Sequence, residues 1–156
     1  MKKIIITVIL AIGFVTAVAA QPKAIGGRLG WGLDLSYEHN VGSKANFMEA
    51  SLGLYGFTGL QLGATYNFMI AQPEWTTKGT WGFYAGPGAT LGMSFFGPFN
   101  VGLMGQIGLE YTFDIPLQLS VDLRPHLGIG IYSGGIYFNA GGLFGFVPSL
   151  AVRYAF

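Results

Sequence analysis

The chain has 156 residues, eight of them basic and seven acidic, and it contains no cysteine. This balance offers no basic surface for nucleic acid, and without cysteine there is no disulfide, thiol chemistry or cysteine-linked lipid. Charged residues make up 10% of the chain, hydrophobic residues make up 51%, and 26 residues are glycine. Such a composition is unusual for a soluble domain, and no second long apolar run is present to form a helical membrane protein.

The first residues have the three parts of a secretory signal peptide. Two lysines are followed by the apolar run 4–18, which ends in small residues. We expect residues 1–20 to be a signal peptide, because the run is short for a bilayer span and no charged stop follows it. Cleavage after Ala19 or Ala20 fits equally, and the remaining 21–156 form one domain. That domain keeps six of the eight basic residues against seven acidic ones.

Downstream, large apolar residues alternate with small or polar residues, which is the pattern of β-strands with one apolar face. Turn residues such as glycine, proline and aspartate separate the alternating segments. The longer connections follow the first and third strands, as expected if long loops lie outside the cell and short turns lie in the periplasm. In chain order, strands are predicted at about 28–38, 46–55, 60–70, 81–93, 99–113 and 117–126.

The segment 128–145 is rich in glycine, and its alternation is weaker. A seventh strand is predicted at 136–143, and an eighth follows Pro148. Bacterial single-chain barrels have even strand numbers, so the sequence predicts an all-β, eight-stranded antiparallel up-and-down transmembrane β-barrel. A six-stranded count, with the glycine-rich segment as one long loop, stays open. Pro87 and Pro125 are expected to mark a bulge or a local break, because proline cannot donate to the ladder.

The charged side chains within the predicted strands all fall on the face opposite the leucines and aromatic residues. In an eight-stranded barrel that face lines a narrow interior, where an unpaired buried charge costs about 3–5 kcal/mol. We therefore predict a core ion-pair network that plugs the barrel and prevents conduction. The other charges are assigned to termini, loops and turns, including Lys23, with Glu38 at a strand end. The predicted network consists of Arg28, Asp34, Glu49, Glu110, Asp122, Arg124 and Arg153.

Several aromatic residues lie on the predicted outward face. Those near strand ends are typical of an interfacial girdle, in which the ring faces lipid and the polar tip faces the headgroups. The residues with this placement are Trp31, Tyr66, Trp81, Tyr111 and Tyr154.

The final stretch resembles the closing strand of bacterial outer-membrane β-barrels. Large apolar residues alternate there with small or polar ones and end on an aromatic residue. In that class the barrel-assembly machinery reads this strand during biogenesis. The resemblance therefore implies an assembly signal, formed by Leu150, Val152, Tyr154 and Phe156.

Further motifs extend the resemblance over most of the mature chain. Gly-x-Glu-Tyr and Asp-x-Arg-Pro lie within 107–125, and Val-Arg-Tyr-x-Phe lies within 151–156. Together with the segments 24–30 and 84–88, they resemble small outer-membrane β-barrel proteins of Bacteroidetes-like bacteria. OmpA/OmpX-type barrels are the nearest analogy in architecture. The resemblance implies the outer membrane of a Gram-negative bacterium and contact with its lipid. It implies no catalytic residues and no particular surface partner.

We expect a non-enzymatic integral outer-membrane protein with a structural or surface-interaction role. No cofactor or metal is expected, because two histidines cannot form a metal cluster by themselves. The alternative is a lipid A-modifying enzyme, an acyltransferase or deacylase, for which Ser120, Ser133, His39 and His126 supply ingredients without a recognisable signature. A third possibility, a soluble lipocalin-like carrier of apolar ligands, requires the aromatic face to point inward and the charges to point to water.

Overall fold

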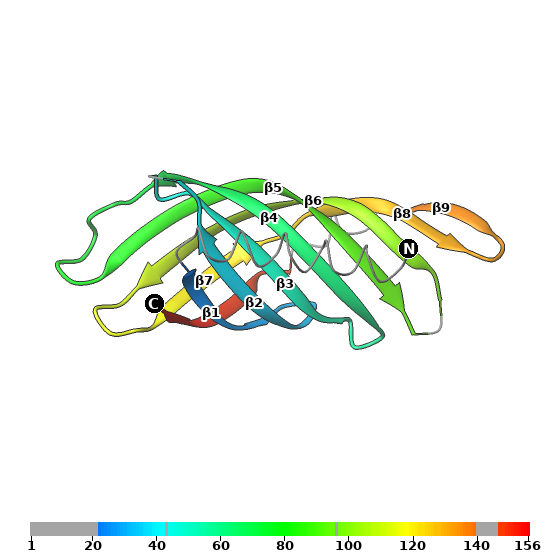
Figure 1. Ribbon diagram of the computed structural model, residues 1–156, viewed down its shortest axis with the longest axis horizontal. Coiled ribbons are helices and arrows are strands. Elements are labelled where there is room, and N and C mark those ends of the chain that lie inside the picture. The colour runs from blue at the N-terminus through cyan, green and yellow to red at the C-terminus, as the bar shows by residue number, and fades with distance from the viewer. Residues whose placement is uncertain (1–21, 43, 96, 140–146) are drawn as a thin grey trace, which may run out of the picture.

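The alternating segments form long antiparallel strands in the computed structural model, which describes residues 22–42, 44–95, 97–139 and 147–156. The predicted signal peptide at 1–20 lies outside these residues. The described part is all-β (Figure 1). Its strands are β1 (Pro22–Leu29), β2 (Gly32–Asn40), β3 (Phe47–Tyr55), β4 (Gly59–Ala71), β5 (Thr80–Ser94), β6 (Phe99–Thr112), β7 (Gln118–Leu123), β8 (His126–Tyr132), β9 (Gly135–Asn139) and β10 (Ser149–Ala155).

Eight of these strands close into a barrel, which confirms the predicted all-β, eight-stranded antiparallel architecture. Each strand from β1 to β7 pairs with the next, and β10 closes the circle between β7 and β1. If the paired residues are followed from strand to strand around the barrel, a path that starts at Val101 on β6 returns to β6 at Tyr111. The strands are therefore staggered by ten residues over one full circuit. Ten residues advance about 33 Å along a strand and eight strands span about 38 Å, so the strands tilt by roughly 40°.

The first predicted strand, 28–38, is wrong as a single element, because the chain turns back within it. β1 pairs with β2 so that Leu29 lies opposite Leu33, with only residues 30–32 between them. Three connecting residues leave the two leucines four positions apart. Both therefore face outward, as they would in one uninterrupted strand. The alternation consequently continued through the turn without a break.

The extra strand changes which connections share an end of the barrel. Pro22 and the C-terminal residue Phe156 lie at one end, called the terminal end here. The longer connections 41–46 and 72–79 lie at this same end (Figure 1). The opposite end, called the far end, carries the short turn at 30–31. The two longer connections therefore share the end of the barrel at which the described chain starts and finishes.

The sixth predicted strand continues beyond its expected end. Residues at 118–123 pair with β6 as β7, and after Arg124 and Pro125 the chain resumes the same register on β6 as β8. Pro125 thus marks the predicted local break, with its carbonyl accepting a hydrogen bond from the Gly105 amide at 2.8 Å. Pro87 stays within β5, at a gap in the ladder between β4 and β5.

The eight strands of the barrel are not the eight that were predicted. β9 covers the start of the predicted seventh strand, pairs with β8 and forms a hairpin that extends beyond the barrel at the far end (Figure 1). Residues 140–143 of that prediction lie outside the described residues. The closed count of eight is reached through β1, which was missed, and without β9.

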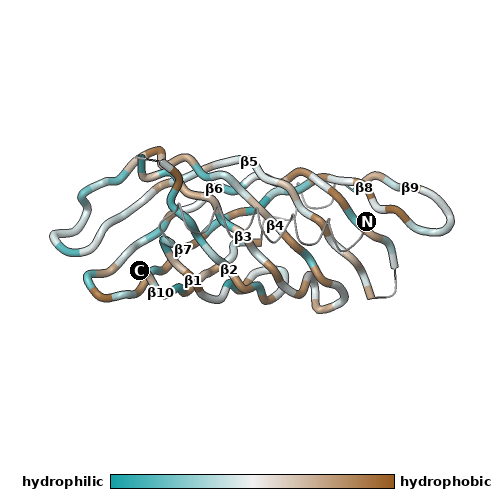
Figure 2. The backbone as a smooth tube through the Cα atoms, viewed as in Figure 1, coloured by the Kyte–Doolittle hydropathy of each residue, from teal (hydrophilic) through white to brown (hydrophobic). Residues whose placement is uncertain are grey.

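The two faces of the barrel wall differ sharply in character. Hydrophobic positions recur along the strands, while the long connection between β4 and β5 at the terminal end is mostly hydrophilic (Figure 2). The outward side chains include exposed leucines, isoleucines and valines, and the inward ones are mainly polar or charged. Examples of the outward set are Leu29, Leu33, Leu35, Leu52, Leu62, Leu91, Leu103, Ile107, Val121, Leu150 and Val152.

The closure between β1 and β10 depends on close backbone approach at Gly26. A Cβ atom there would clash with the backbone oxygen of Val152, whereas one at the neighbouring Gly27 would meet nothing within 4 Å. We predict that Gly26→Ala destabilises the folded barrel by about 1–3 kcal/mol, while Gly27→Ala does not. The mobility of unheated protein on gels, followed through a urea series, measures the folded fraction. Equal urea midpoints for the two variants would contradict this view of the closure.

Candidate functional site

The interior of the barrel is filled by polar and charged side chains. Because successive residues of a strand point to opposite sides, the strands that expose apolar side chains also direct their charges inward. The largest fully buried side chains include Arg28, Arg153, Gln118, Glu38 and Glu49. Buried charges of this kind are tolerated only when paired and hydrogen-bonded, so their partners determine what the interior can do.

Glu49 on β3 is the acceptor shared by three arginines. Its Oε1 contacts Arg28, lies 2.7 Å from Nη2 of Arg124 and lies 3.3 Å from Nη2 of Arg153. The Ser36 hydroxyl donates to the same oxygen at 2.7 Å, and the Gln106 amide donates to Oε2 at 2.8 Å. One carboxylate thus connects side chains from β1, β2, β6 and β10 and from the junction of β7 with β8.

Asp122 on β7 is a second shared acceptor. Nη2 of Arg28 lies 3.1 Å from its Oδ2, and Nε of Arg124 lies 3.2 Å from its Oδ1. Ser149 donates to Oδ1 at 2.6 Å, and the buried Tyr84 hydroxyl donates to Oδ2 at 3.3 Å. Asp122 and Glu49 therefore hold the same two arginines from opposite sides.

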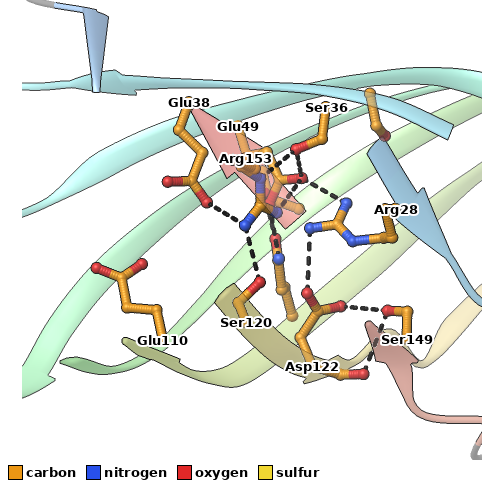
Figure 3. Close-up of polar contacts among 12 residues, drawn as sticks. Arg28, Ser36, Glu38, Glu49, Glu110, Ser120, Asp122, Ser149 and Arg153 are labelled. Atoms are coloured by element: carbon orange, nitrogen blue, oxygen red, sulfur yellow. Dashed lines mark hydrogen bonds and ion pairs between the residues drawn. The ribbon is translucent and has the colours of Figure 1, made fainter. Parts of the chain in front are cut away.

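Arg153 extends the network toward the terminal end. It lies in the middle of the interior, where its guanidinium reaches Glu38 at 3.2 Å as well as Glu49 (Figure 3). It also donates to Ser36 and to Ser120, each at 2.8 Å. Its planar fork of donors explains how one side chain bridges two carboxylates and two hydroxyls.

Lys23 and Glu38 belong to the interior, contrary to their sequence-based placement in a terminus and at a strand end. The Lys23 ammonium lies 2.7 Å from Glu110 and 3.2 Å from Glu38, above the ring of Phe47. Glu38 is fully buried and accepts from Gln118 at 3.1 Å. The pairing of β1 with β2 is irregular between Pro22 and Ala24, which lets Lys23 turn inward.

Of the seven predicted network residues, six take part in ion pairs with one another or with Lys23 and Glu38. Asp34 is the seventh, and within the described residues it forms no ion pair. It is partly buried near Arg124 and Arg28, the two cations that act on it most strongly. The ion pairs of the described part thus join four cations to four carboxylates and leave Asp34 as an additional acceptor.

The predicted assembly-signal residues lie together on the outer face of β10. Leu150, Val152, Tyr154 and Phe156 are all exposed, and the rings of the last two are 5.3 Å apart. The backbone amide of Phe156 donates to the carbonyl of Lys23 at 3.1 Å. These residues therefore form an apolar stripe along the strand that closes the barrel.

The residues considered for enzymatic chemistry lie in different surroundings. His39 faces the Tyr37 hydroxyl at 3.0 Å on β2, and Ser120 accepts from Arg153 inside the barrel. His126 lines a cavity toward the far end, and Ser133 lies in the turn between β8 and β9. Within residues 22–42, 44–95, 97–139 and 147–156, no group of three potential ligands is arranged to hold a metal ion.

Comparisons of the chain with protein-family models, curated proteins and solved structures found no match. In the part of the chain that is described, no helix has the length and apolar character needed to cross a membrane.

The shared carboxylate of Glu49 provides a direct test of the network. We predict that Glu49→Gln destabilises the protein by about 3–5 kcal/mol, because Arg28, Arg124 and Arg153 lose their common counter-charge. Urea unfolding of the purified protein in detergent measures the change. The control Glu74→Gln, in an exposed loop, should change stability by less than about 0.5 kcal/mol. Similar urea midpoints for both variants would show that the network does not stabilise the barrel.

Proposed function

We propose that this chain is an integral β-barrel protein of a Gram-negative outer membrane, with a plugged polar core and a non-enzymatic structural or surface-interaction role. The observation that carries the proposal is that the side chains are distributed in the reverse of the way usual for a soluble protein. Aliphatic side chains cover the outside of the barrel, while the ion pairs fill its inside. Soluble monomers rarely expose apolar patches larger than roughly a few hundred Å². An apolar covering around a whole barrel is suited to lipid.

Aromatic side chains at the two ends of the aliphatic surface support this proposal. At the terminal end, Trp81 packs between Trp75 and Tyr111, with ring centroids 5.3 and 4.7 Å apart. The Tyr111 hydroxyl and the Trp81 indole both donate to loop residues at this end. Exposed Trp31 and Phe57 lie in the turns of the far end. Tryptophan at both rims, which combines an apolar ring with a polar N–H group, is the arrangement expected at membrane interfaces.

The interior supports the proposal of a plugged core. An eight-stranded barrel has an interior that its own side chains can fill. Glu49, Asp122 and Arg153 cross that interior in a connected set of ion pairs (Figure 3). Passage of an ion through this layer would require several pairs to separate at once, so the barrel is closed at this level.

The proposed site of action and route of assembly follow from the sequence resemblance. The exposed stripe of β10 is available for recognition by barrel-assembly machinery, and the surrounding partner is outer-membrane lipid. A lipocalin-like carrier would need the opposite orientation, with apolar side chains inside and charges outside. The distribution of side chains therefore favours the membrane protein over the carrier.

A charge placed in the middle of the outer face distinguishes lipid from water around the barrel. Leu35 on β2 is 57% exposed, so replacement by arginine meets no steric obstacle. We predict that Leu35→Arg destabilises the barrel by about 2–4 kcal/mol in phospholipid vesicles, as measured by urea titration. In an aqueous setting the same change at an exposed site would have an effect within about 0.5 kcal/mol.

The matched control is Ile115→Arg, at a 61% exposed residue in the turn between β6 and β7. This turn lies at the terminal end, where an arginine reaches water or headgroups, so the expected destabilisation is no more than about 1 kcal/mol. Equal small effects of Leu35→Arg and Ile115→Arg in vesicles would contradict the membrane assignment.

The plugged core predicts that the pure protein does not conduct ions. In planar bilayers we expect no stable conductance steps, because the ion-pair layer leaves no continuous aqueous path. Incorporation of folded protein is verified by the gel mobility of protein recovered without heating. Clear and stable conductance from such a preparation would refute the plugged core while leaving the barrel itself intact.

A further inference from the structure

Above the ion-pair layer, toward the far end, the barrel interior contains two adjoining cavities. The space inside them that is open to a small molecule is about 70 Å³ in one and about 80 Å³ in the other, which is room for several water molecules. Gln61, Thr90 and His126 line both cavities, so the two adjoin at a shared wall, and together they are called the cavity here. Arg124 and Asp34 contribute to its floor.

Glycine keeps this part of the interior open. Gly92 on β5 lines the cavity, and a Cβ atom there would make only ordinary contacts, with Leu60 at 3.5 Å and Asn100 at 3.7 Å. Gly102 and Gly128 also line it and lie opposite each other on β6 and β8. The strands that fill the terminal end with long side chains therefore leave a hollow at the far end.

Two polar side chains in the cavity wall lack partners within the described residues. Thr90 is only 8% exposed and Gln61 is partly buried, yet neither side chain makes a hydrogen bond there. Together they provide hydroxyl and amide groups that both donate and accept. The Thr90 hydroxyl is therefore available to a molecule that enters the hollow, and the Gln61 amide can add a second contact.

An aromatic side chain stands beside the cavity. The ring of Tyr137 on β9 packs over Gly130, and its hydroxyl donates to Asn100 at 3.2 Å. Asn100 lines the cavity, and Tyr137 remains 38% exposed. A second ring, that of Tyr132, lies 6.1 Å from it. An exposed aromatic ring therefore stands next to the hydrogen-bonding groups of the cavity wall.

We propose that this cavity binds a saccharide unit. Sugar hydroxyls both donate and accept, which matches the amide and hydroxyl groups of the wall, and the C–H face of a sugar ring packs on an aromatic ring. Asp34, which forms no ion pair with any residue that the structure describes, provides a charged acceptor for two hydroxyls at the floor. A strongly anionic ligand is not favoured, because Arg124 is already engaged by Glu49 and Asp122.

The site goes beyond the proposed membrane function and does not depend on it, because the polar groups assigned to the ligand, those of Gln61, Thr90 and Asp34, face inward. The saccharide has two possible sources: a free sugar, or the headgroup of a glycolipid. Both present the same hydroxyl chemistry. They differ in whether an apolar chain must accompany the sugar.

The test uses the whole mature chain in lauryldimethylamine oxide, a detergent without sugar groups. Methyl β-glycosides of glucose, galactose and N-acetylglucosamine are titrated to millimolar concentration, and binding is followed by saturation-transfer NMR. The octyl β-glycosides of the same sugars form the second arm. Binding of both forms supports a free saccharide as ligand, and binding of the octyl forms alone supports a glycolipid headgroup, provided that the variants below reduce it.

Two variants and one control decide whether the signal comes from the cavity. Gly92→Leu should abolish binding by filling the hollow, and Thr90→Val should weaken it about two- to tenfold by removing one hydrogen-bonding group. Ala89→Leu adds a larger side chain to the outer face of the same strand and should leave binding unchanged. Binding by none of the six glycosides would overturn the proposal, as would signals that neither Gly92→Leu nor Thr90→Val reduces. Thr90→Val also covers the case in which Gly92→Leu does not fold.

Discussion

The structure depends on the pairing of opposite charges that are enclosed in a narrow barrel. Glu49 and Asp122 each contact two or three arginines, and those arginines come from strands far apart in sequence. A slip of one residue in any of these strands would turn its inward charge to the outside and leave its partners unpaired. The ion pairs therefore select the register as well as occupying the interior. The same side-chain alternation places the aliphatic residues outside.

Alternation predicted the all-β class, the barrel and the bounds of β3 to β6 within about two residues, because each of these strands keeps one apolar face throughout. It could not locate the turn at 30–32, where a connection of three residues preserves the order of inward and outward side chains. It also could not distinguish β9, which pairs only within the protruding hairpin, from a strand of the closed barrel. Whether a side chain points inward or outward is set locally by the strand, whereas the choice of partner strand is not.

Six of the seven predicted core residues join the ion pairs for the same local reason: each falls at a position that alternates with the outward apolar residues of its segment. Lys23 was missed because β1 was missed and because a backbone irregularity turns its side chain inward. Glu38 lies on the inward face of its predicted strand. Whether it is inside the barrel or at the rim could be judged only once β1 was known. Phe47 and Tyr84, whose rings lie 5.0 Å apart, are buried at the terminal end of the network. The interior is thus filled toward that end and hollow toward the far end.

The central claim is that lipid surrounds the aliphatic face while the charges pair within. Because the chain contains no cysteine, a single spin label can be placed at one chosen position. The most direct measurement is the accessibility of labels at Leu62, Val121 and Val152, in phospholipid vesicles, to oxygen dissolved in lipid and to a water-soluble nickel chelate. The account predicts strong relaxation by oxygen and little by the chelate at all three positions. Strong relaxation by the chelate would show that water covers this face and would contradict the account.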